Sequence, residues 1–265
     1  MEEKIKWVVK DNKLNEDASQ LSNELNVDII IAEMLVSRGI KTFDQSKSFF
    51  RPNISQLHDP FLMRDMNIAV ERILLAINQK EKIMVYGDYD VDGISSVALM
   101  SSFLKDMGAI VSTYIPDRSE GYGLSTNGIE EAYEKNQTLI ITLDCGINAI
   151  QQSKFASEKG IDLVICDHHL PSEALPKACA ILNPKRKDCN YPFKELCGCG
   201  IGFKLIQAIN NKSGKKIENI LHFLDLVAIA CAADIVSLEG ENRTLTFLGL
   251  RQLNSKPRLG IKLLI

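Results

Sequence analysis

The stretch KIMVYGDYDVDGIS, residues 82–95, joins a mostly apolar run to an acidic turn and to the start of a helical pattern. The run from Lys82 to Tyr86 predicts a strand that is buried on both faces, and the helical pattern begins at Ile94. Between them stand three aspartates at alternate positions: Asp88, Asp90 and Asp92. The stretch therefore predicts a strand–turn–helix unit whose turn is strongly acidic.

The same alternation of strands and helices continues along the chain. Short apolar runs predict further strands at 110–115, 138–143, 163–166 and 178–182. Helical patterns separate the strands or follow the last one, at 94–107, 126–134, 147–159, 201–210, 220–232 and 243–253. Such alternation predicts an α/β fold, a mostly parallel sheet with helices on both faces.

A helical region precedes the first strand. Apolar positions with helical spacing occur at 27–40 and 68–77, and Pro52 and Pro60 interrupt the stretch between them. We therefore predict an N-terminal helical region at 1–80 and a separate α/β domain at 81–265.

Composition limits the class of protein. The chain has 45% hydrophobic residues, and no apolar run approaches the roughly 18 residues of a membrane span. Residues 1–7 lack the apolar core of a signal peptide, and the seven cysteines form no Cys-x-x-Cys pair. We predict a cytoplasmic protein with reduced thiols and no membrane partner. The net charge of -3 gives no general attraction to nucleic acid, so such a partner would need local basic patches or bound metal.

Ionisable side chains follow three of the predicted strands. The acidic turn after the first strand is matched by Asp144 and by the triplet Asp167, His168 and His169. Because parallel strands end at one edge of a sheet, these groups should meet there. Their turns contain no Lys or Arg, so close carboxylates need another counter-charge. Aspartate oxygens with imidazole nitrogens suit Mn²⁺ or Mg²⁺, and this many carboxylates favour two ions, which points to phosphoester hydrolysis.

Other interpretations fit parts of this pattern. A lone aspartate after a strand, such as Asp144, is more often a helix N-cap. The turn also resembles the start of haloacid-dehalogenase-type phosphatases and of receiver domains, but neither accounts for Asp-His-His after a later strand. The glycines at 198, 200 and 202 would either admit a phosphate to a helix N-terminus or allow close packing.

An ordered series of motifs resembles the DHH phosphoesterase superfamily, and within it the single-stranded-DNA-specific exonucleases. The matching segments span most of the chain, at 57–63, 87–93, 120–124, 143–146, 167–169, 182–185, 191–193, 196–204, 233–236 and 241–243. The resemblance implies a metal-dependent enzyme that degrades single-stranded DNA from 5′ to 3′ in recombination and repair. It further implies contacts with a single-stranded-DNA-binding protein and a helicase.

The resemblance also assigns roles to individual residues. One metal ion would be held by Asp90 and Asp144, and the second by Asp92, Asp144, His168 and Asp234. His169 would contact the scissile phosphate. Asp88 and Asp167 would lie at the edge of the site, where they would either bind the first ion or orient His168 or a metal-bound water. Candidate substrate contacts are Arg118, Tyr122, Lys185, Arg186 and Arg243.

Three expectations stay open at this point. A relative that acts on short oligoribonucleotides or cyclic dinucleotides would use the same metal centre. A nucleic-acid-binding module without catalysis would share the fold. We also expect the chain to lack the C-terminal parts of the family, namely the second, glycine- and histidine-bearing domain (DHHA1) and an oligonucleotide-binding fold.

Overall fold

The computed structural model describes residues 16–264, which form two compact units, 16–53 and 54–264. The described part of the first unit contains α1 (Glu16–Leu25), α2 (Ile29–Val36) and α3 (Phe43–Phe50). Its small core is made by five buried side chains: Ala18, Leu21, Ala32, Leu35 and Val36. Two of its helices begin at side-chain caps, because Asp28 accepts from the N–H of Ile30 and Thr42 forms a capping box with Gln45.

The second unit is built on a parallel sheet of five strands. The strands are β1 (Lys82–Gly87), β2 (Ile110–Tyr114), β3 (Leu139–Leu143), β4 (Asp162–Cys166) and β5 (Ala180–Leu182). They lie in the order β2-β1-β3-β4-β5, and every pair is parallel. The predicted fold class is therefore confirmed.

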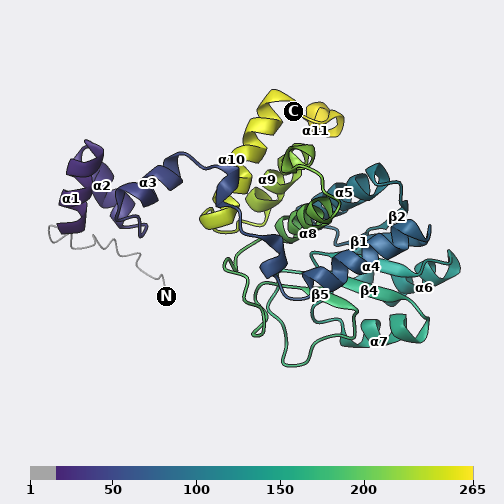
Figure 1. Cartoon of the computed structure of the whole chain (residues 1–265). Helices are drawn as coiled ribbons and strands as arrows, with labels where there is room; N and C mark the ends of the chain where they lie inside the picture. Colours follow the sequence, from purple (N-terminus) through teal and green to yellow (C-terminus); the bar gives the residue numbers. More distant parts are fainter. Residues whose placement is uncertain (1–15, 265) are drawn as a thin grey trace, which may run out of the picture. The chain divides into compact units, whose positions relative to one another are not determined.

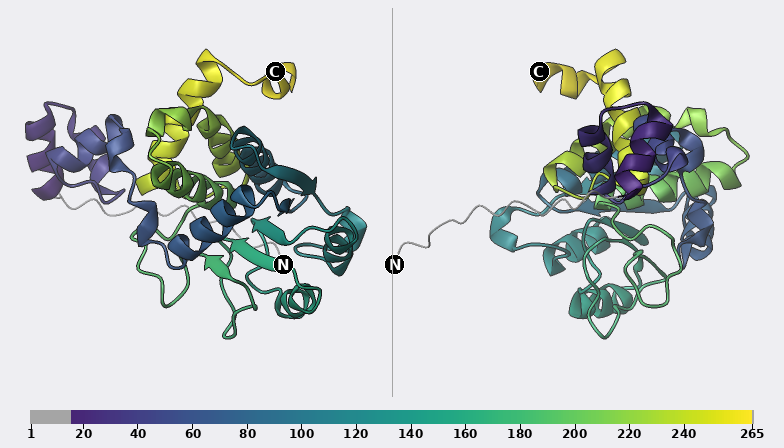
Figure 2. Two further views of the ribbon diagram at one scale, coloured as in Figure 1. Left: turned by 45° about the vertical axis from the view of Figure 1, so that its right-hand side comes forward. Right: turned by 90° about the vertical axis from the view of Figure 1, so that its left-hand side faces the viewer.

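Helices cover both faces of this sheet (Figure 1). The helices on one face are α4 (Met66–Asn78), α5 (Val91–Asp106) and α8 (Gly198–Lys212), and those on the other are α6 (Thr126–Glu134) and α7 (Ile150–Glu158). Two more helices, α9 (Leu224–Ala233) and α10 (Gly240–Ser255), pack on the first layer on the side away from the sheet (Figure 2). The short elements are η1 (Ile54–Gln56), η2 (Pro60–Leu62), η3 (Arg118–Glu120), η4 (Ile217–Asn219), η5 (Leu221–Phe223) and α11 (Leu259–Leu264).

The first strand shows why the apolar runs are continuous. Ile83 and Val85 point into the core under α4, α5 and α8, whereas Met84 and Tyr86 point into the core under α6 and α7. Successive side chains of a strand alternate between faces, and both faces are buried here. A run without polar interruption is the sequence that such a strand requires.

Strand order also locates the functional edge of the sheet. From β1 the chain crosses to β2 on one side and then returns to β3 on the other, so the connections diverge between β1 and β3. Ligands of open parallel sheets bind outside the carboxyl ends of the strands at such a point. The acidic turn after β1 and Asp144 after β3 both lie there.

Within residues 16–264, no helix is both long and apolar enough to cross a membrane. The prediction about a signal peptide concerns residues 1–7, which lie outside the described part of the chain.

Candidate metal centre at the sheet edge

The turn after β1 is fixed by helix caps and by a glycine. Asp90 caps α5 by accepting the N–H of Gly93 at 2.9 Å. A Cβ on Gly93 would lie 2.5 Å from the backbone nitrogen and oxygen of Asp88, so only glycine fits this turn. Asp92 lies in the first turn of α5, and its two oxygens accept hydrogen bonds from the N–H groups of Gly198 and Cys199, each at 2.7 Å.

The bonds from α8 to Asp92 favour close packing, rather than phosphate binding, as the role of the glycines at 198, 200 and 202. The first N–H groups of α8 bind Asp92, which places a carboxylate where a phosphate would otherwise bind. A Cβ at position 198 would lie 2.6 Å from the Cβ of Asp144, and one at position 202 would lie 3.2 Å from Leu143. The glycines at 198 and 202 therefore allow α8 to approach the end of β3 closely.

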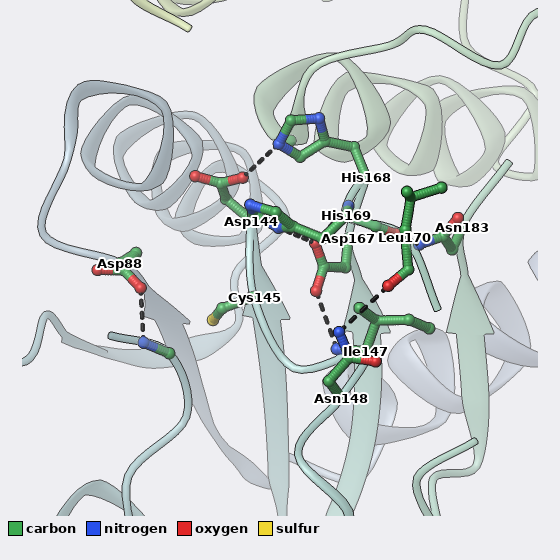
Figure 3. A network of polar contacts seen from close by, with 12 residues as sticks. Asp88, Asp144, Cys145, Ile147, Asn148, Asp167, His168, His169, Leu170 and Asn183 are labelled. Atoms are coloured by element: carbon green, nitrogen blue, oxygen red, sulfur yellow. Dashed lines mark hydrogen bonds and ion pairs between the residues drawn. The ribbon is translucent and has the colours of Figure 1, made fainter. Parts of the chain in front are cut away.

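Asp144 is held in an unusual backbone conformation. Its φ is 61°, in the left-handed region, its side chain is buried, and α7 begins six residues later without using it as a cap. Its Oδ1 atom lies 3.0 Å from Nε2 of His168 but has no hydrogen-bond partner among the described residues (Figure 3). An unsatisfied buried oxygen is costly, so Asp144 is poised for a ligand that these residues do not supply themselves.

His168 is shared by two groups of possible metal ligands. One group is Asp144, His168 and His169, and the other is Asp92, His168 and Asp234. Nε2 of His168 lies 3.7 Å from Oδ2 of Asp234 and 4.0 Å from Oδ2 of Asp92. The structure thus brings together residues from the ends of β3 and β4, the first turn of α5 and the end of α9.

Electrostatics at this cluster favours a bound cation. Burial, followed by the nearby charge of Asp92, raises the pKa of Asp144 to about 10. Burial also raises the pKa of Asp92 to about 6, against its two backbone hydrogen bonds. Burial lowers the pKa of His168, which keeps a lone pair on the imidazole. Without a cation, the carboxylates would be partly protonated; with one, they can all be ionised.

The spacing of the donor atoms also fits an octahedral metal ion. Neighbouring ligands of an octahedral ion with bonds of about 2.1 Å stand roughly 3.0 Å apart. The 3.0 Å between Oδ1 of Asp144 and Nε2 of His168, without hydrogen-bond alignment, matches this distance. The residues present therefore suit a hard divalent ion such as Mn²⁺ or Mg²⁺.

Asp167 holds the histidine turn in place. Its oxygens accept hydrogen bonds from the N–H groups of Ile147 at 2.9 Å and His169 at 3.1 Å. Its Oδ1 also lies 2.7 Å from Nδ1 of His169 (Figure 3), and this bond raises the pKa of His169 to about 9. Although burial opposes it, the contact with His169 keeps the pKa of Asp167 below its ordinary value. Asn183 completes the support by donating to the carbonyl of His169 at 2.8 Å.

Asp88 lies at the edge of the cluster and is not a member of either ligand group among the described residues. It is completely buried, and burial raises its pKa. Its oxygens accept the N–H of Tyr89 at 2.6 Å and the N–H of Gly123 at 2.7 Å. The structure thus places Asp88 between the acidic turn and the loop that carries Tyr122.

Aromatic and basic side chains form a line that leads to His169. The guanidinium of Arg118 lies 5.0 Å from the ring centre of Tyr89. Tyr89 meets Tyr122 edge to face at 5.8 Å, and Tyr122 meets His169 in the same way at 5.8 Å. Arg118 and Tyr122, predicted as substrate contacts, therefore lie beside the cluster.

The other three predicted substrate contacts lie in different surroundings. Arg186 is buried, pairs with Asp65 at 2.6 Å and Asp188 at 2.8 Å, and donates to the carbonyl of Ile181, so that it covers the outer edge of β5. Lys185 lies near the histidine turn, because its N–H donates to Asn183. Arg243 is half-buried on α10, and burial lowers its pKa.

Some residues of the cluster have no signal in the strand pattern. Asp234 ends α9, a helix, so the argument from strand ends does not reach it; only the family resemblance supplied it. Tyr89 and Asn183 were not predicted as site residues, because their roles depend on contacts between distant segments.

Comparisons with known proteins agree with this geometry. A model of the DHH family, N-terminal domain, matches residues 82–231. Single-stranded-DNA-specific exonuclease RecJ from Bacillus subtilis (strain 168) is 41% identical over 263 residues, which are 99% of this chain and 33% of the relative. RecJ from Escherichia coli (strain K12) is 38% identical over 209 residues, 74% of this chain and 36% of the relative. The chain thus spans about a third of the curated relatives it matches.

Solved structures show the same fold. A crystal structure of exonuclease RecJ bound to manganese superposes with a TM-score of 0.71 and 30% identity, covering 80% of this chain and 53% of that chain. RecJ in complex with Mn²⁺ from Thermus thermophilus gives a TM-score of 0.79 and 26% identity, covering 94% of this chain and 35% of that chain. The resemblance predicted from the sequence is confirmed, and the chain belongs to the DHH family.

Proposed function

We propose that the chain is the catalytic part of a metal-dependent exonuclease that removes nucleotides from the 5′ end of single-stranded DNA. The observation that carries this proposal is the pair of ligand groups that share His168. Relatives named as single-stranded-DNA-specific exonucleases support the choice of substrate. The reaction is hydrolysis of a phosphodiester bond.

Asp92, Asp144, His168 and Asp234, which belong to these ligand groups, would hold two ions, Mn²⁺ or Mg²⁺, together with Asp90, which belongs to neither group and caps α5. When bound, two such ions activate a water and stabilise the attacking and leaving oxygens at phosphorus. The two bonds from backbone N–H groups hold the carboxylate of Asp92 in a fixed position and oppose the effect of burial on its pKa, so it needs no reorganisation when substrate arrives.

His169 has a separate task in this proposal. Its contact with Asp167 raises its pKa to about 9, so the imidazole is cationic at neutral pH. Because Nδ1 faces Asp167, Nε2 is the atom that can donate a hydrogen bond to a phosphate oxygen. Asp167 fixes the ring in this orientation.

Single strand would be recognised through exposed bases. Bases stack on aromatic side chains, and basic side chains follow phosphates. The line of Arg118, Tyr89 and Tyr122 offers both kinds of contact next to His169. Arg186 is paired with two carboxylates, and Nζ of Lys185 lies 3.8 Å from Oε2 of Glu195; Lys185 and Arg243 remain proposed phosphate contacts. Three further predictions remain. They are contacts with a single-stranded-DNA-binding protein and a helicase, a cytoplasmic location, and a domain boundary near residue 80.

The test is hydrolysis of 5′-phosphorylated single-stranded DNA in Mn²⁺ by the chain and by Asp144→Asn. The variant keeps the shape of the side chain but loses charge, so we expect at least a hundredfold loss of hydrolysis with an unchanged circular dichroism spectrum. Asp106→Asn, at the exposed far end of α5, is the matched control and should keep its rate. Full activity of Asp144→Asn would contradict the metal mechanism, and faster cleavage of dinucleotides than of long single strands would contradict the substrate.

A further inference from the structure

A cavity of about 320 Å³ adjoins the histidine turn on the side of α7. It lies between the loop at 122–124, the segment at 145–149 that follows β3, and the first turn of α7. Asp167 and His169 form part of its wall, so it opens directly beside the candidate metal centre. Figure 3 shows Ile147 and Asn148 on one side of Asp167, with Asp144 and His168 on the other.

The walls of this cavity are mainly apolar and aromatic. Leu124, Cys145 and Ile147 are buried, and Tyr122 supplies an aromatic ring. The volume is at the lower end of the roughly 300–1,000 Å³ typical of small-molecule sites. The cavity therefore has room for one flat heterocycle with its sugar but not for a stack of several.

The amide of Gln152 is one of the polar groups in the wall of this cavity. Gln152 lies in the first turn of α7 and is half-buried, and its side chain forms no hydrogen bond with any residue in 16–264. The other lining amide, Asn148, is already used: it donates to the carbonyl of Leu170 at 3.2 Å and accepts from the N–H of Ser172 at 2.9 Å and from its hydroxyl at 2.8 Å. Within the described part of the chain, Gln152 thus offers a free donor and a free acceptor inside an apolar cavity.

We propose that this cavity receives the base of the terminal nucleotide, with Gln152 hydrogen-bonded to the polar edge of the base and Tyr122 against its ring. This inference rests on the proposed function. A base held here would place its own sugar and the following phosphate towards His169 and the metal centre. Because an amide presents both a donor and an acceptor, and every base has both along its edge, the site would hold any base.

The experiment measures binding of a 5′-phosphorylated, 3′-labelled oligonucleotide by fluorescence anisotropy, with Ca²⁺ in place of Mn²⁺ to slow cleavage. Three versions are compared: all bases present, the first nucleotide abasic, and the last nucleotide abasic. Stacking of a base on an aromatic ring contributes strongly to the binding of single strands, so removal of the first base should weaken binding about tenfold. Removal of the last base should change it less than twofold.

Variants then test the residues. Gln152→Ala should reduce the effect of the first base to about threefold, and Ala149→Phe, which fills the cavity, should abolish it. Gln151→Ala is the matched control, because Gln151 is the exposed neighbour on α7 and does not line the cavity. Circular dichroism checks that each variant is folded.

Each outcome has a defined meaning. A first base that adds less than twofold to affinity would overturn the cavity proposal and leave the exonuclease proposal intact. An equal effect of the first base in Gln152→Ala and Gln151→Ala would overturn the assignment of Gln152. Failure to bind any of the three oligonucleotides would overturn the proposed function, and the cavity proposal with it.

Discussion

The carboxylate of Asp88 accepts a hydrogen bond from the N–H of Gly123, and so it joins the acidic turn after β1 to the loop that carries Tyr122. This contact makes Asp88 a positioning residue. We expect Asp88→Asn to disturb the loop, because an amide retains only one acceptor oxygen for two N–H groups. The KM for single-stranded DNA should rise about fivefold, while Mn²⁺ affinity measured by calorimetric titration should change less than twofold. A tenfold loss of Mn²⁺ affinity would instead make Asp88 a metal ligand.

Gly198 controls how closely α8 approaches Asp144. A Cβ at this position would lie 2.6 Å from the Cβ of Asp144 and 2.7 Å from its Oδ1, so one of the two must move. We expect Gly198→Ala to weaken Mn²⁺ binding tenfold or more, as measured by titration calorimetry. Gly260→Ala is the control, because a Cβ there meets nothing within 4 Å. Unchanged Mn²⁺ affinity in Gly198→Ala would contradict a metal site that depends on the close approach of α8 to Asp144.

The fold was largely predictable because the strands are buried on both faces. Every predicted strand is present with its ends within two residues, since a continuous apolar run has no alternative environment in this unit. Helix starts were less accurate. The α5 helix begins at Val91, before the predicted Ile94, and α8 begins at Gly198, before the predicted Ile201. Both starts depend on caps, the carboxylate of Asp90 and the sulfur of Cys197, which carry no apolar periodicity.

The sequence pattern predicted site residues only where they directly follow a strand. The acidic turn, Asp144 and the histidine turn follow β1, β3 and β4, so their meeting follows from the parallel sheet. Asp234 lies at the end of a helix, so the strand pattern does not predict it. Gln152 becomes a candidate only through the cavity that it lines. Which oxygen binds which N–H depends on packing between segments far apart in sequence, as for Asp92 with α8, and periodicity does not contain that information.

Mn²⁺ should stabilise the chain against heat. An ion that binds only the folded state adds about 2.7 kcal/mol at a concentration one hundred times its dissociation constant. The unfolding temperature measured by differential scanning calorimetry should therefore rise with Mn²⁺ concentration. Asp144→Asn should lose most of this rise and Asp106→Asn none of it. Equal rises in both variants would mean that the ions bind elsewhere.

Arg72 should stabilise the fold at neutral pH and lose this effect in acid. Its guanidinium binds Glu81 at 2.7 Å and Asp162 at 2.7 Å, and the hydrogen bond from Arg72 lowers the pKa of Glu81 below its ordinary 4.5. A lowered pKa stabilises the folded state above the ordinary value, and this contribution disappears as the pH falls through the folded-state pKa. Arg72→Gln should therefore cost up to about 1 kcal/mol at neutral pH and less in acid. Urea unfolding at pH 7 and pH 3.5 measures both; an equal loss at the two pH values would contradict the assignment.

The buried ion pair between Lys204 and Glu241 should behave differently from a surface pair. Nζ of Lys204 lies 3.1 Å from Oε1 of Glu241, both side chains are fully buried, and the hydroxyl of Tyr191 donates to the other oxygen at 2.6 Å. Removal of one partner leaves an uncompensated charge in the core, which typically costs about 3–5 kcal/mol. We expect Lys204→Met to lose this amount of unfolding free energy in urea titration. The double variant with Glu241→Gln should recover part of it, because no buried charge then remains. If the double variant had a lower unfolding free energy than Lys204→Met, the charge left on Glu241 would not be the cause of the destabilisation in Lys204→Met.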